Sequence, residues 1–330
     1  MVDRKDFSTI VLAFYKYVEL SDPKGEVQKH KDFFTERDIT SRIYISEEGI
    51  NGQMSASHKD AKAYIDWMHS RSEFKDVQFK LHYWHEQVFP KQTVKYRKQL
   101  VAIEESVDIA NTGTHLSPQE WKEMLETSND HILIDVRNDY EWEVGHFEGA
   151  ELPKCATFRE FKEYAENLET TTDKKKPVMM YCTGGIRCEI YSAVLKEKGF
   201  ENVYQLDGGI INYGLKEGSK KWLGKLFVFD DRLTVPISDE DPDVISKCHQ
   251  CGCQTDNYYN CANMDCNKLY ICCNECLEKL KGCCCESCTD APRLRPYHQQ
   301  NPHKPFRKYH HYFGQKSPPQ TSQTPSKVRS

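Results

Sequence analysis

The chain has 330 residues, enough for two or three domains of ~100–200 residues each. Charged residues make up 29% of it and hydrophobic residues 38%, a balance typical of a protein that stays in solution and buries a core. It opens with charged residues, and its densest early apolar stretch, 9–15, is far shorter than the ~20 residues of a membrane span. These features argue against secretion and membrane insertion, so we expect a cytoplasmic protein.

The first hundred residues alternate strand-like and helix-like patterns. Within 58–71, Ala61, Tyr64, Ile65 and Met68 recur with the spacing of one helix face. Strands are expected at 9–18, 41–45, 50–55 and 77–83, and helices at 23–37 and 58–71. This βαββαβ order predicts a ferredoxin-like (acylphosphatase-like) domain over 1–104, followed by a linker at 105–115.

A basic stretch closes the first domain. It carries four cations, Lys91, Lys95, Arg97 and Lys98, interleaved with Phe89 and Tyr96. Cations with aromatic neighbours can hold phosphates and stack on bases, so these four are candidate substrate-binding residues for a nucleic acid. An ordinary exposed strand or loop between domains explains the same pattern.

The second unit, 116–222, alternates short apolar strands with helices. Ser117 and Glu120 form a capping box that starts the first helix. Strands are expected at 131–134, 177–181 and 202–206, and helices at 158–168 and 188–198. This alternation predicts an α/β fold with a parallel sheet, whose loops gather at the strand C-termini. Residues 223–247 then form a connector.

The segment 181–188 is the most informative part of the chain. Cys182 ends a buried strand, two glycines follow, and Arg187 stands just before a helix. Backbone N–H groups, a helix N-terminus and a guanidinium all stabilise a thiolate or a persulfide. Cys182 and Arg187 are therefore the candidate catalytic residues. Cys188 is a candidate resolving thiol, although a small buried residue at the start of the helix explains it as well.

Cysteines concentrate near the C-terminus, where 248–288 holds twelve of the fifteen. Without a secretory signal, such a cluster is more typical of metal binding than of disulfides. Four ordered pairs fit two tetrahedral zinc sites: Cys248/Cys251, Cys261/Cys266, Cys273/Cys276 and Cys284/Cys288. The pairs can combine in an interleaved or a sequential arrangement, and an iron–sulfur cluster is the alternative to structural zinc.

The last segment, 289–330, is basic. From Ala291 onward there are eight basic residues and no acidic one, although the whole chain carries a net charge of −5. The composition predicts a partly disordered tail that either reaches an anionic partner or is simply solvated.

Several motifs together resemble a known family. The stretch 133–150, with its Asp-x-Arg, Glu and Gly-His-x-x-Gly-Ala elements, resembles the rhodanese signature, as do Cys182 and the turn 207–209. The motifs at 48–52, 89–97 and 113–118, the loop 182–188 and the C-terminal cysteines resemble the rhodanese-containing tRNA uridine hydroxylases.

The resemblance implies an enzyme that acts on tRNA and converts the wobble uridine to 5-hydroxyuridine with molecular oxygen. Cys182 matches the essential cysteine, while Asp135 and Arg137 match residues that support the loop. The chain shows neither a G-x-G-x-x-G motif nor a facial triad, so the residues do not identify a cofactor that activates oxygen.

Two other functions stay open at this point. A rhodanese-type sulfurtransferase would carry a persulfide on Cys182, and its loop would look the same. A zinc-bearing RNA-binding protein without catalysis is disfavoured, because it would have no need of the intact cysteine loop.

Overall fold

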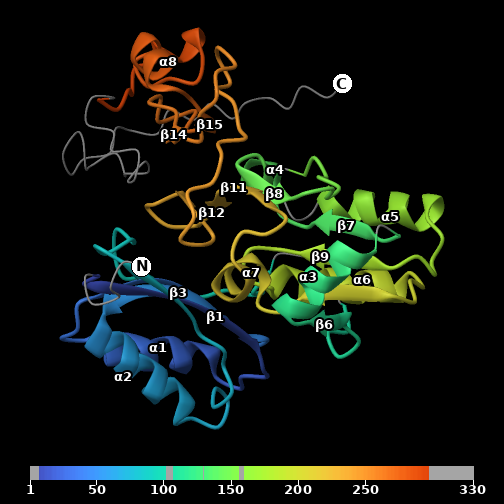
Figure 1. The fold of residues 1–330 in the computed structure, drawn as a ribbon. Coiled ribbons are helices and arrows are strands. Elements are labelled where there is room, and N and C mark those ends of the chain that lie inside the picture. The colour runs from blue at the N-terminus through green and yellow to red at the C-terminus, as the bar shows by residue number, and fades with distance from the viewer. Residues whose placement is uncertain (1–6, 102–106, 129, 156–159, 297–330) are drawn as a thin grey trace.

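The computed structural model describes residues 7–101, 107–128, 130–155 and 160–296. An N-terminal domain, a central α/β domain and a C-terminal cysteine-rich segment follow one another along the chain (Figure 1). Most of the basic tail, from residue 297 on, lies outside the described residues. No helix in the described part of the chain is long and apolar enough to cross a membrane.

A five-stranded sheet in the order β4-β1-β3-β2-β5 forms the N-terminal domain. Its elements are β1 (Thr9–Tyr17), α1 (Pro23–Phe34), β2 (Ile39–Ser46), β3 (Gly49–Ser57), α2 (His58–His69), β4 (Lys80–Trp84) and β5 (Val94–Tyr96). The βαββαβ expectation is confirmed. The last of its four strands begins at Lys80 rather than at Val77, and the basic stretch contributes a fifth strand, β5, parallel to β2.

Helices α1 and α2 cover one face of this sheet. Apolar side chains that alternate along the strands, such as Leu12, Ile43 and Met54, pack there against Phe34 and Tyr64. Figure 1 shows both helices on the side of the sheet turned away from the rest of the molecule. The intervening strand residues therefore point from the opposite face toward the central domain.

The central domain is built on a parallel sheet in the order β6-β10-β9-β7. Its elements are β6 (Thr114–Leu116), α3 (Pro118–Thr127), β7 (Ile132–Asp135), α4 (Asp139–Trp142), β8 (Gly145–Phe147), α5 (Phe161–Thr171), β9 (Val178–Tyr181), α6 (Ile186–Glu197), β10 (Val203–Leu206) and α7 (Gly209–Glu217). Helices α5 and α6 pack on one face, and α3 and α7 on the other. The expected α/β fold with a parallel sheet is confirmed.

Two helix starts in this domain differ from expectation. Helix α6 begins at Ile186, so Cys188 lies inside its first turn rather than at its start. Gly185, with φ +103°, can turn the chain directly into the helix. Helix α5 begins at Phe161, and the expected start at Phe158 lies outside the described residues.

The C-terminal part consists of short elements. Strand β11 (Trp222–Gly224) pairs with β8, and β12 (Leu226–Phe227) pairs with β13 (Thr234–Val235). The cysteine-rich segment contains the hairpin β14 (Tyr258–Asn260) and β15 (Leu269–Ile271), the helix α8 (Asn274–Lys279) and a 3₁₀ turn at Glu286–Cys288. Its core is made largely of cysteines, with Tyr259 and Tyr270.

Candidate active site and metal centres

The Cys182 loop connects β9 to α6 at the carboxyl edge of the parallel sheet. The backbone N–H of Gly185 donates to Cys182 Sγ at 3.1 Å. The first turn of helix α7 binds two carbonyl oxygens of the loop. Ile210 N donates to Cys182 O at 3.0 Å, and Ile211 N donates to Thr183 O at 3.2 Å. A Cβ on Gly209 would lie 2.5 Å from Cys182 O, so the turn at 207–209 needs glycine for this close approach.

These surroundings favour the Cys182 thiolate. Burial alone would raise the pKa of this thiol, but a hydrogen bond from Cys188, the charge of Arg187 and the N–H groups of Arg187 and Gly185 lower it to about 5. Burial and the adjacent thiolate hold the pKa of Cys188 well above its usual range. Cys182 is therefore ionised at neutral pH, while Cys188 remains a thiol that donates to it.

Arg187 is held by a buried carboxylate. Its guanidinium contacts Glu141 at 2.6 and 2.7 Å, and Thr183 Oγ1 donates to the same carboxylate at 3.1 Å. Glu141 is fully buried, which by itself disfavours its charge, but Arg187 keeps its pKa below the usual value. We assigned no role to Glu141 from the sequence, although it lies within the rhodanese signature at 133–150.

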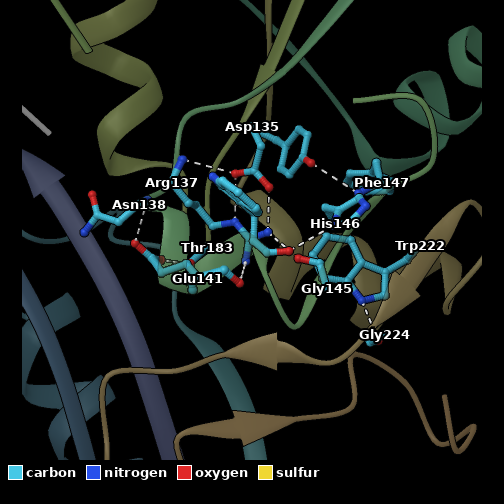
Figure 2. A network of polar contacts seen from close by, with 12 residues as sticks. Asp135, Arg137, Asn138, Glu141, Gly145, His146, Phe147, Thr183, Trp222 and Gly224 are labelled. Carbon is cyan, nitrogen blue, oxygen red and sulfur yellow. Dashed lines mark hydrogen bonds and ion pairs between the residues drawn. The ribbon is translucent and has the colours of Figure 1, made fainter. Parts of the chain in front are cut away.

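Asp135 and Arg137, at the end of β7, form a buried ion pair (Figure 2). Arg137 Nε and Nη2 donate to the Asp135 carboxylate at 2.8 and 2.6 Å, and Nη2 also donates to Gly145 O at 2.6 Å. The Arg137 guanidinium carbon lies 5.3 Å from the centre of the Trp222 ring. This network joins the end of β7 to β8 and β11.

A pocket of about 440 Å³ lies between the loop and the open face of the N-terminal sheet. Cys182, Thr183 and Gly184 line one side, and residues of β1 to β4 line the other. The other lining residues come from both domains and from the connector: Ala13, Phe14, Tyr15, Arg42, Tyr44, Asn51, Gly52, Gln53, Lys80, Leu100, Val101, Asn138, Ile186, Arg187, Ile211 and Phe229. Its size falls within the ~300–1,000 Å³ of small-molecule sites.

Two contacts tie the domains together across this pocket. Lys80 Nζ donates to Gly184 O at 2.6 Å, and Tyr15 Oη donates to Glu189 Oε1 at 2.8 Å. Burial lowers the pKa of Lys80 to about 8, against the opposing charges of Cys182, Asp207 and Glu189. Neither Lys80 nor Tyr15 was singled out from the sequence, because an outward-facing position on a sheet is usually exposed to solvent.

The basic stretch lies near the pocket. Lys91, Lys95, Arg97 and Lys98 are all exposed. Leu100 and Val101, two and three residues after Lys98, line the pocket. The Arg97 guanidinium lies 5.0 Å from the ring centre of Tyr44, which also lines it. A polyanion held by these cations would therefore pass the mouth of the pocket.

The cysteine-rich segment brings its sulfurs together in two groups of four. One group is Cys248, Cys251, Cys273 and Cys276, and the other is Cys261, Cys266, Cys284 and Cys288. Within each group, the sulfur atoms all lie within 4.8 Å of one another. This is the interleaved arrangement, in which the first and third pairs combine and the second and fourth pairs combine.

The sulfur spacing fits a single tetrahedral ion in each group. Sγ atoms lie 3.7 Å apart for Cys251–Cys273 and for Cys266–Cys284. Zinc–sulfur bonds of ~2.3 Å in a tetrahedron require ~3.8 Å between sulfurs, whereas an iron–sulfur cluster spreads its cysteines further apart. Cys253, Cys272, Cys283 and Cys285 lie outside both groups.

Comparisons with known proteins agree with this architecture. Family models match at three places: the UPF0176 acylphosphatase-like domain at 9–100, the rhodanese-like domain at 117–216 and the rhodanase C-terminal model at 223–289. The fold and the loop thus define a rhodanese-containing protein with an added N-terminal domain. A rhodanese-like domain protein from Staphylococcus aureus is 24% identical over 31% of this chain and 91% of its own, with a TM-score of 0.27.

Relatives along the whole chain are closer. A tRNA uridine(34) hydroxylase from Protochlamydia amoebophila is 63% identical over 93% of this chain and 96% of the relative. Those of Chlamydia muridarum and Chlamydia felis are 55% and 54% identical over 91% of this chain, and over 92% and 93% of theirs. The chain belongs to the tRNA uridine(34) hydroxylase family.

Proposed function

We propose that this protein hydroxylates C5 of uridine 34 in tRNA, with molecular oxygen as the oxygen source and Cys182 as the essential thiolate. The observation that carries the proposal is the Cys182 loop itself. It holds a thiol with a pKa of about 5 beside a pocket that two domains share. The family membership supplies the substrate and the position that is modified.

The role of Cys182 follows from the chemistry of uracil. Addition of the thiolate to C6 makes C5 nucleophilic toward an oxygen species, and loss of the C5 proton with departure of the thiolate restores the aromatic base. Placing one atom of dioxygen on C5 reduces the other to water, and we assign the two electrons and two protons that this takes to an external dithiol, which is oxidised to a disulfide. Arg187 stabilises the thiolate before attack and after release, and the Cys188 thiol shares that task.

We further propose that Lys91, Lys95, Arg97 and Lys98 hold the phosphates of the anticodon arm. Their exposure and their position beside the pocket support this assignment. The eight cysteines in the two groups of four would hold zinc, which would fold a segment that has little apolar core of its own.

The test uses tRNA from a host that lacks its own hydroxylation and expresses either the wild type or Cys182→Ser. Nucleosides are digested and measured by mass spectrometry. The proposal expects 5-hydroxyuridine with the wild type and none with the variant. Unmodified uridine 34 with a folded, expressed wild type would contradict it, as would equal product from Cys182→Ser.

A sulfurtransferase is the second candidate, because the same loop stabilises the terminal sulfur of a persulfide. Donor N–H groups and Arg187 surround Cys182 whatever the sulfur species. Thiosulfate sulfurtransferase activity, or a thiolated nucleoside in place of 5-hydroxyuridine in the same digest, would favour this reading.

A further inference from the structure

One row of side chains crosses the open face of the N-terminal sheet, opposite the Cys182 loop. Strand register aligns Arg42 of β2 with Gln53 of β3, Gln53 with Ala13 of β1, and Ala13 with Lys80 of β4. All four line the pocket that contains Cys182. We call Arg42, Gln53, Ala13 and Lys80 the cross-sheet row.

The middle of the row is suited to a flat polar ring. Ala13 has only a methyl group, which leaves space between the longer side chains on either side of it. Gln53 Oε1 is buried and accepts no hydrogen bond from any described residue. A buried amide oxygen without a donor is costly. Because Gln53 lines the pocket, a ligand N–H there can supply the missing hydrogen bond.

Lys80 provides the complementary group. Its Nζ uses one hydrogen to bind Gly184 O and has further hydrogens to donate, whether the amine is charged or neutral. The row therefore offers an acceptor at Gln53 and a donor at Lys80, one on each side of Ala13. Imide groups carry the matching pattern, an N–H flanked by two carbonyl oxygens.

We propose that the cross-sheet row reads the Watson–Crick edge of a uracil base flipped into this pocket, with Gln53 Oε1 accepting from N3–H and Lys80 Nζ donating to a flanking carbonyl oxygen. The proposal rests on the proposed function and adds the residues that select its base. Enzymes that act on a base commonly take it out of the stack and read this edge.

This orientation also suits the chemistry. N3 lies across the six-membered ring from C6, so a uracil whose N3 edge faces the sheet presents its C5–C6 bond toward the loop. Tyr15 and Tyr44 line the same pocket and can contact the ring or the neighbouring nucleotides. The sheet then selects the base, and the loop that carries Cys182 acts on it.

The proposed arrangement predicts that cytosine is rejected. Cytosine has an unprotonated N3, so it would set an acceptor against Gln53 Oε1. Its C4 amino group would also set a donor against Lys80 in the orientation in which Lys80 donates to O4 of uracil. One mispaired buried group costs ~1–3 kcal/mol, which is roughly 5- to 150-fold in affinity.

The experiment measures binding without turnover. Anticodon stem-loop RNAs carry uridine, cytidine or N3-methyluridine at position 34, and their dissociation constants with the full chain are measured under argon. The proposal expects the uridine RNA to bind about 5- to 150-fold more tightly than either of the others. Equal binding of uridine and N3-methyluridine would overturn it, and this arm needs no protein variant.

Protein variants then locate the effect. Gln53→Met, which removes the acceptor at nearly constant size, is expected to erase the preference for uridine over N3-methyluridine. Gln53→Glu keeps an acceptor and is expected to retain part of that preference. Gln119→Met, on the exposed side of α3, is the matched control and should bind as the wild type does. An unchanged preference in Gln53→Met would overturn the assignment.

The outcomes separate this inference from the proposed function. If the wild type prefers uridine through Gln53 but never forms 5-hydroxyuridine in air, the hydroxylase proposal fails and the base-reading row stands. If it forms 5-hydroxyuridine but binds N3-methyluridine equally well, only the base-reading row fails.

Discussion

At the residue scale, the reactivity of Cys182 depends on groups from one short stretch of chain. Gly185, Arg187 and Cys188 all lie within six residues of it and together outweigh the cost of burying its charge. Such local determinants are visible in a sequence, which is why Cys182 and Arg187 could be identified before the fold was known. The carboxylate that holds Arg187 comes from a distant helix and could not be assigned in the same way.

The first prediction concerns the ionisation of Cys182. Below a pH of about 5 the group is a thiol, and above it the thiolate predominates, so alkylation by iodoacetamide should rise through that midpoint. Arg187→Gln removes the nearby positive charge and should move the midpoint up by ~1–3 pH units. Alkylation of the peptide containing Cys182, followed by mass spectrometry across pH, measures both values.

Arg37→Gln, at the surface of the N-terminal domain, serves as the control and should leave the midpoint unchanged. A wild-type midpoint near 9 would contradict the described environment of Cys182.

At the element scale, the buried Asp135–Arg137 pair joins the end of β7 to β8. Arg137→Met leaves the Asp135 carboxylate buried without its partner and should lower the free energy of unfolding by ~3–5 kcal/mol. Lys62→Met, which breaks an exposed pair with Asp66 on α2, should cost only ~0–1 kcal/mol. Urea denaturation measures the free energy of unfolding of both variants. An equal decrease in the two would contradict a larger contribution of the buried pair to stability.

Several elements followed directly from sequence patterns, while others needed the three-dimensional arrangement. The capping box of Ser117 and Glu120 forms as expected, because both partners are local. The alternation along 77–83 predicts that Lys80 lies on the sheet face away from the helices, and it does. Only the packing of the two domains makes that face one wall of a pocket. Strand β5 was equally compatible with a loop, since its pairing with β2 is a long-range contact.

At the scale of the whole molecule, the cysteine-rich segment shows the limit of spacing arguments. Four cysteine pairs predicted two tetrahedral sites but allowed two ways of combining them. The fold of the segment combines the pairs in the interleaved arrangement. Residue spacing alone could not predict this, because it is the same for both arrangements.

Zinc content tests the interleaved arrangement. The wild type should contain about two zinc ions per chain, measured by elemental mass spectrometry. Cys248→Ser with Cys276→Ser should lose one ion, because both belong to one group, whereas Cys248→Ser with Cys284→Ser should lose both. A loss of both ions in the first double variant would favour sequential pairing, and iron in place of zinc would contradict the assignment of the metal.

The basic stretch is tested by its effect on the RNA. Lys95→Glu with Arg97→Glu should raise KM for tRNA about tenfold or more and reduce the salt dependence of binding, because phosphate contacts release counterions. The value of kcat should change little, since neither side chain lines the pocket. A fall in kcat at unchanged KM would contradict a role in holding phosphates.

The most direct test of the central claim is to trap the base on its cysteine. An anticodon stem-loop with 5-fluorouridine at position 34 is incubated with the wild type, and the adduct is mapped by peptide mass spectrometry. Fluorine at C5 blocks the proton loss that releases the thiolate, so we predict a covalent adduct on Cys182 and none with Cys182→Ser. A wild type that makes 5-hydroxyuridine yet forms no adduct, or forms it on another cysteine, would contradict the account.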